Sequence, residues 1–507
     1  MASEARVITF AEKHWSNWHR TLTRDPIADR VEIHNPETNP GMGGMRKTAA
    51  AIQGLIAATT AAGLRMHPVG GRWSHSSVAT PSGGRLIETA TLNWRFRPEA
   101  ASLSPNYKGD PAELVLVQCG IAVAELNKWL ETGLGRSLRT TGSSNGQTIV
   151  GAFTTSSHGS AVDMGALHNQ VCGLQLLTGS RNLWLERSTD PIAGDALVAA
   201  LGATRAPGDD LFDAALVSLG GLGIIHSVML RTAPIFRLEA HQIVLPYDEA
   251  MKRAMNGFDF SGIALPRGAE RPYYFRAIVN PNDGRHRAYV QVMYKRPFPP
   301  GTKIDYSIDG EFGPGHDIPG LVAGLLDTVP GLNGPLTALM VDNQLKTYSN
   351  RLGTWGETFD FTTPRKDAAA SSMAIPQHLT SRAIELATDE YQKAPGPVVF
   401  TCRFVRKTQG LLAWQMNDQN CVFELDGLNS KRARAVMERV RTRFDTEGLP
   451  YAQHWGKLNG LTKARVERSF GKDRLDRWRK ARETLLPTPQ ERRTFSNAYL
   501  ENIGLGA

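Results

Sequence analysis

The chain has few cysteines and no long hydrophobic run. Its 507 residues include four cysteines, and none of these belongs to a CxxC pair, which argues against a zinc site and against a disulfide scaffold. No segment is long and apolar enough to span a bilayer, and residues 1–30 lack the apolar run of a signal peptide. We therefore expect a soluble, cytoplasmic protein with no metal site and no membrane association.

Length and composition fit a globular protein with more than one folding unit. A chain of 507 residues exceeds the size at which a single hydrophobic core stops growing, so we expect two domains or one domain with a large insertion. Hydrophobic residues make up 41% of the chain, which excludes a disordered or fibrous protein.

The first half alternates helix and strand signals. Residues 47–63 have apolar side chains at helical spacing and end at Gly63, and residues 64–71 are typical of a strand. A buried strand is predicted at 114–119, a helix closed by glycine at 121–135, a β-hairpin at 171–186, and a strand ending at Pro234. The pattern predicts a mixed helix and strand domain.

From about residue 235 the sequence changes to longer strands separated by loops rich in Pro and Gly. The segments "AYVQVMYK", "VVFTCRFVR" and "CVFELDG" are typical of strands, and residues 379–393 of a helix. This predicts an antiparallel sheet with helices on one face. In "VVFTCRFVR" the period of two places Phe400, Cys402 and Phe404 on one face and Arg403 on the other, toward solvent or a cleft.

The net charge of +9 is concentrated near the C-terminus. Residues 431–493 contain eighteen Lys or Arg and eight Asp or Glu, so the rest of the chain is close to neutral. Within "KARVERSFGKDRLDRWRKARE", charges of both signs alternate with Val466, Phe470, Leu475 and Trp478 near helical spacing. This pattern indicates solvated helical faces, and no aromatic-rich strand accompanies the charges, so we expect no nucleic-acid partner.

Three segments are rich in glycine and hydroxyl side chains. They are "HPVGGRWSHSSVATPSGG" at 67–84, "TTGSSNGQTIVGAFTTSSHG" at 140–159 and "SLGGLGII" at 218–225. Backbone amides and hydroxyls can donate to phosphate without side-chain bulk. Any one of these loops is an ordinary turn by itself. Three of them in one mixed domain favour a phosphate-bearing cofactor.

Two further motifs are weakened by their context. "GLGRSL" at 133–138 imitates a dinucleotide fingerprint, but it follows a predicted helix and places Leu138 where the third glycine is needed. "GSSNG" at 142–146 matches a nucleophile elbow with Ser144 as the nucleophile. The residues that follow are too rich in Gly, Thr and Ser to open a helix, which leaves a serine hydrolase as a distant alternative.

The glycine-rich segments also carry a resemblance to a known family. "VGGRWSHSSVATPSGGRLIETATLN", "GQTIVGAFTTSSHGSAVDMGALHNQVCGLQLLTGSRN" and "FDAALVSLGGLGIIHSVMLRTAP" resemble the FAD-binding domain of the vanillyl-alcohol oxidase family, also called PCMH-type flavoproteins. "HWGK" at 454–457 and "FSNAYLENIGL" are similar to the branch with sugar-lactone and alditol oxidases. The likeness covers residues 40–235 and 450–505 in the family's order.

The resemblance implies an α+β fold with a two-subdomain FAD-binding domain and a cap with an antiparallel sheet flanked by helices. The implied domains are an FAD-binding domain at 1–235, a substrate-binding cap at 236–449 and a C-terminal segment at 450–507 that completes the flavin site. The residues implied to bind FAD are Gly70, Gly71, Arg72, Trp73, Ser74, His75, Ser76, Gly142, Ser143, Gln147, Thr148, Gly151, His158, Gly159, Gly223 and Ile225.

The resemblance also implies a reaction: a hydride passes from an alcohol or hemiacetal CH–OH carbon of a small substrate to the flavin, which O2 reoxidises. Lys457 matches the family lysine near the reacting centre, and His454 is a candidate proton acceptor or a structural hydrogen-bonding residue. Alternatives are a dehydrogenase with another acceptor and a flavin-fold cyclase or lyase without net redox chemistry. The sequence leaves the oligomeric state open.

The cap departs from the family pattern at one position. Related oxidases often have a stretch like "MEYAVP", whereas this chain has "SSMAIP" at 371–376, which places Ser372 where the carboxylate would be. Arg403 keeps the family's position in "CRFVR" and is a candidate substrate contact. Loss of the acid with retention of the base predicts a pocket receptive to an anionic or carbonyl-bearing substrate.

The first glycine loop bears on how the cofactor is held. In related lactone oxidases the corresponding run reads like "GGGHS", and its histidine is bonded to the flavin, whereas here Trp73 occupies that slot. His75 lies two residues on, roughly 6–7 Å further along an extended loop, which is too far for the same bond in this register. We therefore predict that FAD is held without a covalent bond and that Trp73 packs on the flavin's dimethylbenzene edge.

Overall fold

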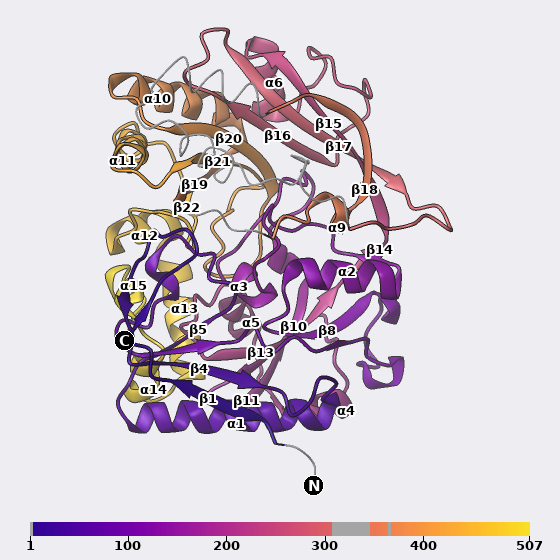
Figure 1. Cartoon of the computed structure of the whole chain (residues 1–507), viewed down its shortest axis with the longest axis vertical. Coiled ribbons are helices and arrows are strands. Elements are labelled where there is room, and N and C mark those ends of the chain that lie inside the picture. The colour runs from indigo at the N-terminus through magenta and orange to yellow at the C-terminus, as the bar shows by residue number, and fades with distance from the viewer. Residues whose placement is uncertain (1–3, 307–344, 363–366, 507) are drawn as a thin grey trace.

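The computed structural model describes residues 4–306, 345–362 and 367–506 (Figure 1). Two sheets from the first half of the chain form the lower part of Figure 1, and one large sheet forms the upper part. Parts of the predicted cap, residues 307–344 and 363–366, lie outside the described residues. The predicted domain limits at 235 and 449 stay a prediction.

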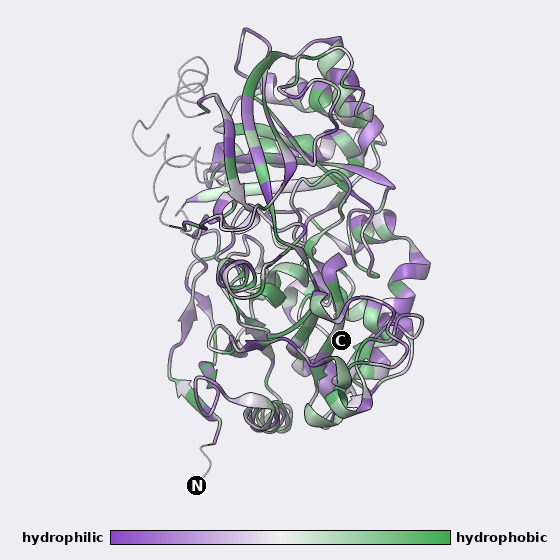
Figure 2. Ribbon diagram, turned by 90° about the vertical axis from the view of Figure 1, so that its right-hand side faces the viewer, coloured by the Kyte–Doolittle hydropathy of each residue, from purple (hydrophilic) through white to green (hydrophobic). Residues whose placement is uncertain are grey.

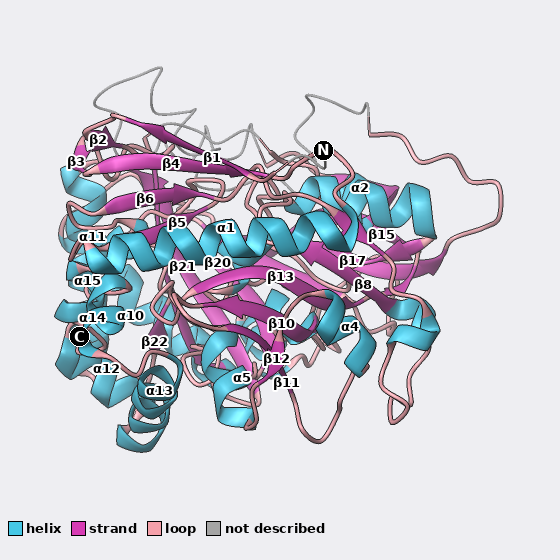
Figure 3. Cartoon of the chain, turned by 90° about the horizontal axis from the view of Figure 1, so that it is seen from below, coloured by secondary structure: helices cyan, strands magenta, loops and turns pink. Residues whose placement is uncertain are grey.

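The smaller sheet of the lower part has the order β1-β4-β6-β5, and β4, β6 and β5 run parallel. Its strands are β1 (Arg6–Phe10), β4 (Asp29–His34), β6 (Arg85–Glu88) and β5 (Met66–Val69). Helix α1 (Gly41–Ala61) lies across this sheet (Figure 3). Ala49, Ile52 and Ile56 recur at helical spacing and pack in one core with residues of both lower sheets, so α1 joins the two sheets.

The second sheet of the lower part has six strands in the order β12-β11-β10-β13-β8-β7, and it is antiparallel except for the short β11–β12 pair. Its strands are β7 (Arg95–Phe96), β8 (Leu114–Gln118), β10 (Val171–Leu177), β11 (Asn182–Glu186), β12 (Thr204–Arg205) and β13 (Ile224–Arg231). Helix α2 (Val123–Leu134) ends at Gly135, whose φ of 61° is the left-handed geometry that favours glycine. The predicted hairpin at 171–186 is confirmed.

The upper part is an antiparallel sheet of eight strands in the order β18-β15-β17-β16-β20-β21-β19-β22. Its strands are β15 (Phe236–Pro246), β16 (Tyr274–Val279), β17 (Arg287–Pro297), β18 (Tyr348–Thr354), β19 (Ala368–Pro376), β20 (Val398–Arg406), β21 (Gln419–Leu428) and β22 (Ala452–Gln453). Helices α6 (Glu249–Gly257), α10 (Thr380–Lys393) and α11 (Lys431–Thr446) cover one face of it (Figure 1). The structure therefore has the predicted α+β class.

The two faces of the upper sheet differ in chemistry. One face, which we call the helix face, packs Phe400, Cys402 and Phe404 in a core with apolar residues of α10 and α11. The opposite face, which we call the inner face, carries Arg403 and its neighbours across the strands and turns toward the lower part. The predicted alternation along β20 is confirmed, and it directs the polar residues of this strand away from the helices.

The C-terminal helices pack back onto the first half of the chain. They are α12 (Lys463–Phe470), α13 (Lys472–Leu485), α14 (Pro489–Thr494) and α15 (Ala498–Asn502). Val466, Phe470, Leu475 and Trp478 are buried in a core with residues of the lower sheets, as the helical spacing predicted. Figure 2 shows hydrophilic residues on the outward turns of peripheral helices. No helix in the described ranges is both long and apolar enough to cross a membrane.

Short elements complete the described chain. They are β2 (His14–Trp15), β3 (Asp25–Pro26), β9 (Arg136–Ser137), β14 (Ala233–Pro234), α3 (Ile149–Phe153), α4 (Asp195–Ala200), α5 (Asp209–Leu216), α9 (Trp355–Thr358) and the 3-10 turns η1 (Ser77–Ala79), η2 (Ala100–Ser102), η3 (Pro111–Glu113), η4 (Leu167–Gln170) and η5 (Gln377–Leu379).

Candidate functional site

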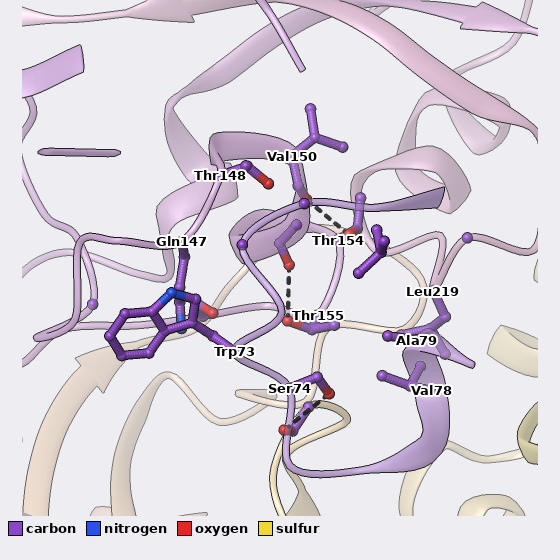
Figure 4. Close-up of a pocket in the computed structure, with 18 of the residues that line it drawn as sticks. Trp73, Ser74, Val78, Ala79, Gln147, Thr148, Val150, Thr154, Thr155 and Leu219 are labelled. Atoms are coloured by element: carbon purple, nitrogen blue, oxygen red, sulfur yellow. Dashed lines mark hydrogen bonds between the residues drawn. The ribbon is translucent and has the colours of Figure 1, made fainter. Parts of the chain in front are cut away.

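The three glycine-rich loops meet at one cleft between the lower sheets and the inner face of the upper sheet. The loop after β5, the loop that contains α3 and the loop before β13 all line it, and it encloses about 1280 Å³ of space including its open mouth. Figure 4 shows Trp73 of the first loop beside Gln147 of the second, and Leu219 of the third beside Ala79 of the first.

Glycine is required where these loops approach their neighbours. A Cβ atom at Gly70 would lie 1.9 Å from Oγ1 of Thr148, so the first and second loops could not meet with a larger residue there. Gly220 has a φ of 71°, and a Cβ atom there would lie 2.5 Å from a ring carbon of His67. The glycines therefore hold the third loop against β5 and the first loop against the second.

Most of the residues predicted to hold FAD line this one cleft. Those that do are Gly70, Gly71, Arg72, Trp73, Ser74, Gly142, Ser143, Gln147, Thr148, Gly151, His158, Gly223 and Ile225. His75, Ser76 and Gly159 are not among the lining residues, and they support the loops from behind. Ser76 Oγ, for example, donates to the carbonyl oxygen of Trp455 at 2.6 Å.

The first loop is not extended, contrary to the geometry assumed from the sequence. Arg72 has a φ of 59°, and its guanidinium pairs with Glu88. This turn directs Trp73 to the cleft, while His75 is buried and stacks on His19 with ring centroids 4.1 Å apart. Trp73 and His75 both contact the ring of His19, and of the two only Trp73 borders the cleft.

The cleft residues fit a cofactor that carries phosphates and a flat ring. Backbone amides and hydroxyls of the glycine loops supply neutral donors, and Trp73 supplies an apolar face. Thr148 borders the cleft, and its buried Oγ1 has no hydrogen-bond partner among the described residues. A buried hydroxyl without a partner indicates a place where a bound molecule completes the hydrogen bonding.

The loop at 454–457 lies at the edge of the upper sheet and reaches the same cleft. The amide of His454 donates to the carbonyl of Ser372 at 3.0 Å, and the amide of Leu458 donates to the carbonyl of Ala370 at 2.8 Å. These two bonds fix the loop beside β19, and His454 and Lys457 both line the cleft. Arg403 lines it from β20, so the structure brings all three predicted catalytic residues together.

His454 and His158 both engage Nδ1 in a backbone hydrogen bond, but their Nε2 atoms differ in protonation. Nδ1 of His454 accepts from the amide of Gly456 at 2.9 Å, so in the neutral ring the proton sits on Nε2. Burial, with positive charge nearby, holds the pKa of His454 well below its usual value, so this ring is neutral. His158 Nδ1 faces the carbonyl of Gly159 at 3.0 Å and donates to it, which leaves Nε2 as an acceptor. The predicted proton-accepting role of His454 is therefore disfavoured, and a donor role fits it.

A carboxylate that the sequence did not single out completes the site. Glu424 lies on β21 directly opposite Ser372, whose hydroxyl donates to its Oε1 at 3.0 Å. Its Oε2 lies 2.7 Å from Nε of Arg403, and Nη1 of Arg403 donates to Ser143 at 2.8 Å. The expectation that this pocket has lost its acid is wrong, because the neighbouring strand supplies one.

The charge on Glu424 follows from its surroundings. Burial alone would raise the pKa of its carboxyl, but Arg403, His158, Lys457 and the Ser372 hydroxyl outweigh burial and lower that pKa. Glu424 is therefore ionised at neutral pH. Two residues along the strand, burial and the charge of Glu424 raise the pKa of Asp426 to about 8. The two acids thus differ in charge, and among the described lining residues Glu424 is the carboxylate that borders the cleft.

Comparison with known proteins identifies a cofactor-binding domain in the first half of the chain. Residues 46–181 match the family model described as an FAD binding domain. A D-arabinono-1,4-lactone oxidase of Saccharomyces cerevisiae is 29% identical over 140 residues, which are 27% of this chain and 23% of that protein. The chain thus spans about a quarter of the length of that relative. An L-gulono-1,4-lactone dehydrogenase of Mycobacterium tuberculosis is 24% identical over 96% of this chain and 98% of its own.

The fold is also found among solved structures. A cholesterol oxidase from Brevibacterium sterolicum superposes with a TM-score of 0.68 at 14% identity over 98% of this chain and 97% of its own, which shows a shared fold. The first two glycine loops that line the cleft lie within the matched FAD-binding segment, and the third lies after its end at residue 181. The chain therefore contains an FAD-binding domain of the PCMH type, and its cofactor is FAD.

Proposed function

We propose that this protein is an FAD-dependent oxidoreductase that oxidises a CH–OH group of a small polyhydroxylated substrate. The observation that carries the proposal is the arrangement of Lys457, Arg403 and Glu424, which converge on the cleft formed by the glycine loops. FAD, when bound, supplies the acceptor for the hydride that leaves the substrate carbon. A ring that gains negative charge is stabilised by a nearby cation, and the ammonium of Lys457 is suited to that role.

The substrate's hydroxyl proton must leave as its carbon becomes a carbonyl. Glu424 is ionised and His158 offers a free ring nitrogen lone pair, whereas the lone pair of His454 is already used by Gly456. We assign the proton to Glu424, because Ser372 and Arg403 fix both of its oxygens at the cleft wall. His454 then serves as a hydrogen-bond donor through Nε2 to a substrate oxygen.

The names of the relatives favour one class of substrate, and they suggest two kinds of electron acceptor, O2 and another oxidant. Relatives that carry lactones in their names support a sugar lactone or a close derivative over a simple alcohol. We propose O2 as the electron acceptor, in line with the relative named an oxidase. The relative that matches along nearly the whole chain is named a dehydrogenase, which is a specific reason to test a second acceptor.

A serine hydrolase built on Ser144 is not supported by the geometry. Ser144 borders the cleft in an irregular loop, and no described histidine or carboxylate is hydrogen-bonded to its hydroxyl. A nucleophilic serine needs such a base within hydrogen-bond reach.

The test is the visible spectrum of the purified protein under nitrogen. L-gulono-1,4-lactone, D-arabinono-1,4-lactone and a panel of alditols are added in turn, and the flavin band is followed. We expect bleaching by at least one of these compounds and recovery of the band when air is admitted. A band that bleaches but recovers only with an artificial acceptor identifies a dehydrogenase. A flavin band that no CH–OH compound bleaches contradicts the proposed oxidation.

A further inference from the structure

A segment near the N-terminus lies against the first glycine loop. It belongs to the connection between β2 and β3, and we call residues 17–21 the N-terminal clamp. Nε1 of Trp18 donates to the carbonyl oxygen of Gly71 at 2.7 Å, and the amide of Trp18 donates to the carbonyl oxygen of Arg72 at 3.2 Å. One residue of the clamp therefore holds two successive carbonyls of the loop.

Two further side chains of the clamp hold the carbonyls that follow. Nδ2 of Asn17 donates to the carbonyl oxygen of Ser74 at 2.7 Å, and Oγ1 of Thr21 donates to the carbonyl oxygen of His75 at 2.8 Å. The clamp therefore fixes the direction of four of the five carbonyls at 71–75.

The direction of each carbonyl also sets the direction of the next amide. In a trans peptide the C=O and the N–H that follows it point to opposite sides, and none of the described peptide bonds is cis. The φ of 59° at Arg72 is typical of the left-handed helical conformation, in which successive peptide groups point the same way. Since the carbonyls of Gly71 and Arg72 both point to the clamp, the amides of Arg72 and Trp73 both point away from it.

The side of the loop opposite the clamp faces the cleft. The carbonyl of Ser74 points to the clamp, and the amide of His75 in the same peptide group donates to the carbonyl oxygen of Gly456, a cleft residue, at 2.7 Å. Arg72 and Trp73 line the cleft, and among the described residues no acceptor is hydrogen-bonded to either of their amides. Two successive free amides in a turn form a concavity that binds anions.

The side chain of Arg72 does not take over the task of these amides. Its guanidinium pairs with Glu88, which also pairs with Arg30, so the charge of Arg72 is balanced within the protein. An anion at this part of the loop therefore depends on the backbone amides, whose direction the clamp sets.

We propose that the N-terminal clamp is part of the cofactor site, and that Asn17, Trp18 and Thr21 are positioning residues that hold the amides of the first glycine loop toward the phosphates of FAD. The clamp precedes the segment at 46–181 that matches the FAD binding domain, so that match assigns it no role. Loss of one of its hydrogen bonds frees a peptide group of the loop to rotate, which turns an amide donor away from the phosphates.

The first test measures the release of FAD from the loaded protein, as the flavin fluorescence that returns after dilution. Trp18→Phe removes the indole N–H from a side chain that is 47% exposed, and Thr21→Val removes the hydroxyl with little change of shape. We expect each variant to release FAD roughly 2 to 10 fold faster than the wild type, the range for loss of one neutral hydrogen bond. The double variant should be faster than either, and Thr21→Ser, which keeps the hydroxyl, should keep the wild-type rate.

Trp94→Phe is the matched control for the loss of an indole N–H. Nε1 of Trp94 donates to Oδ1 of Asn39 at 2.7 Å, and Trp94 is not among the residues that line the cleft. Its release of FAD should equal that of the wild type. Wild-type release by both Trp18→Phe and Thr21→Val would overturn the proposal.

The second test separates a role at the phosphates from a general role in the fold. The full chain is produced free of flavin, in a host starved of riboflavin, and is titrated with FAD and with riboflavin, which has the same ring system and no phosphate. We expect Trp18→Phe and Thr21→Val to lower the affinity for FAD by roughly 2 to 10 fold and to leave the affinity for riboflavin unchanged. Equal losses of affinity for the two ligands would show that the clamp only supports the fold, against the proposal.

Neither test involves turnover, so the clamp and the proposed oxidation fail in different ways. Clamp variants that bind FAD as the wild type does refute the positioning role and leave the oxidation. A flavin that no CH–OH compound bleaches, in a protein whose clamp variants lose affinity for FAD but not for riboflavin, refutes the oxidation and leaves the clamp.

Discussion

Replacing Glu424 by glutamine tests the assignment of the substrate proton. The side chain is 3% exposed, its Oε2 lies 2.7 Å from Nε of Arg403, and its Oε1 accepts from Ser372 at 3.0 Å. Glutamine keeps the shape and one acceptor oxygen but removes the charge. Loss of a buried ion-pair partner costs roughly 3–5 kcal/mol of stability. Because the amide oxygen of glutamine can still accept a hydrogen bond, we expect a loss of about 3 kcal/mol. Loss of a proton acceptor should slow flavin reduction by roughly 10² to 10⁴ fold.

The assay is anaerobic stopped-flow reduction with a substrate that bleaches the wild type. His158→Asn is the competing variant, because His158 is the other acceptor at the cleft, and Asp426→Asn controls for loss of a buried acid on the same face. We expect Glu424→Gln to slow reduction far more than either of them while FAD stays bound. Wild-type reduction by Glu424→Gln together with a large loss in His158→Asn would refute the assignment and move the proton to the histidine.

Four further outcomes follow from the same geometry. Lys457→Met should slow flavin reduction by roughly 10² fold with FAD retained, and an unchanged rate in stopped flow would remove Lys457 from the catalytic residues. Arg403→Ala should weaken substrate binding by roughly 10 to 150 fold, the equivalent of 1.5–3 kcal/mol, in a spectral titration that leaves the flavin band itself in place. After denaturation and gel filtration the yellow colour should elute with small molecules, whereas a flavin-modified peptide containing His75 would contradict non-covalent attachment. Burial raises the pKa of Asp426 to about 8, whereas the unfolded chain loses this proton above about pH 4, so the wild type loses stability as the pH rises between these values. The melting temperature of Asp426→Asn should therefore exceed that of the wild type by a margin that widens up to about pH 8. A margin that stays constant with pH would show that Asp426 is not protonated in the folded protein.

Much of the fold could be predicted because its signals are local. The buried strand at Leu114–Gln118, the hairpin at 171–186 and the glycine end of α2 each follow from a short window of sequence. The glycine loops were identified in the same way, and their meeting at one cleft followed from the family resemblance. The alternation of side chains along a strand was likewise enough to predict that Arg403 lies on the face of β20 opposite Phe400, Cys402 and Phe404.

The parts that could not be predicted depend on contacts between distant segments. Glu424 lies 52 residues from the Ser372 hydroxyl that binds it, and no spacing in the sequence connects the two. The placement of His75 was missed for the same reason: its ring stacks on His19, which belongs to a distant segment, and the left-handed backbone of Arg72 gives no local signal in the sequence. Cross-strand register, which pairs Arg276 with Arg403, is likewise set by the whole sheet.

The position of Glu424 also explains how the cleft can keep a carboxylate although the segment at 371–376 has Ser372 in place of a glutamate. In an antiparallel sheet, directly opposed residues on one face place their Cβ atoms roughly 4.5–5.5 Å apart, so a carboxylate on β21 reaches nearly the same space as one on β19 at Ser372. Ser372, which replaces the expected carboxylate, donates a hydrogen bond to Glu424 and so orients it. The acid and Arg403 balance each other in charge, and Lys457, which also lines the cleft, adds a further positive charge. We therefore expect this cleft to keep a proton acceptor for the proposed CH–OH oxidation, although the segment at 371–376 lacks a carboxylate.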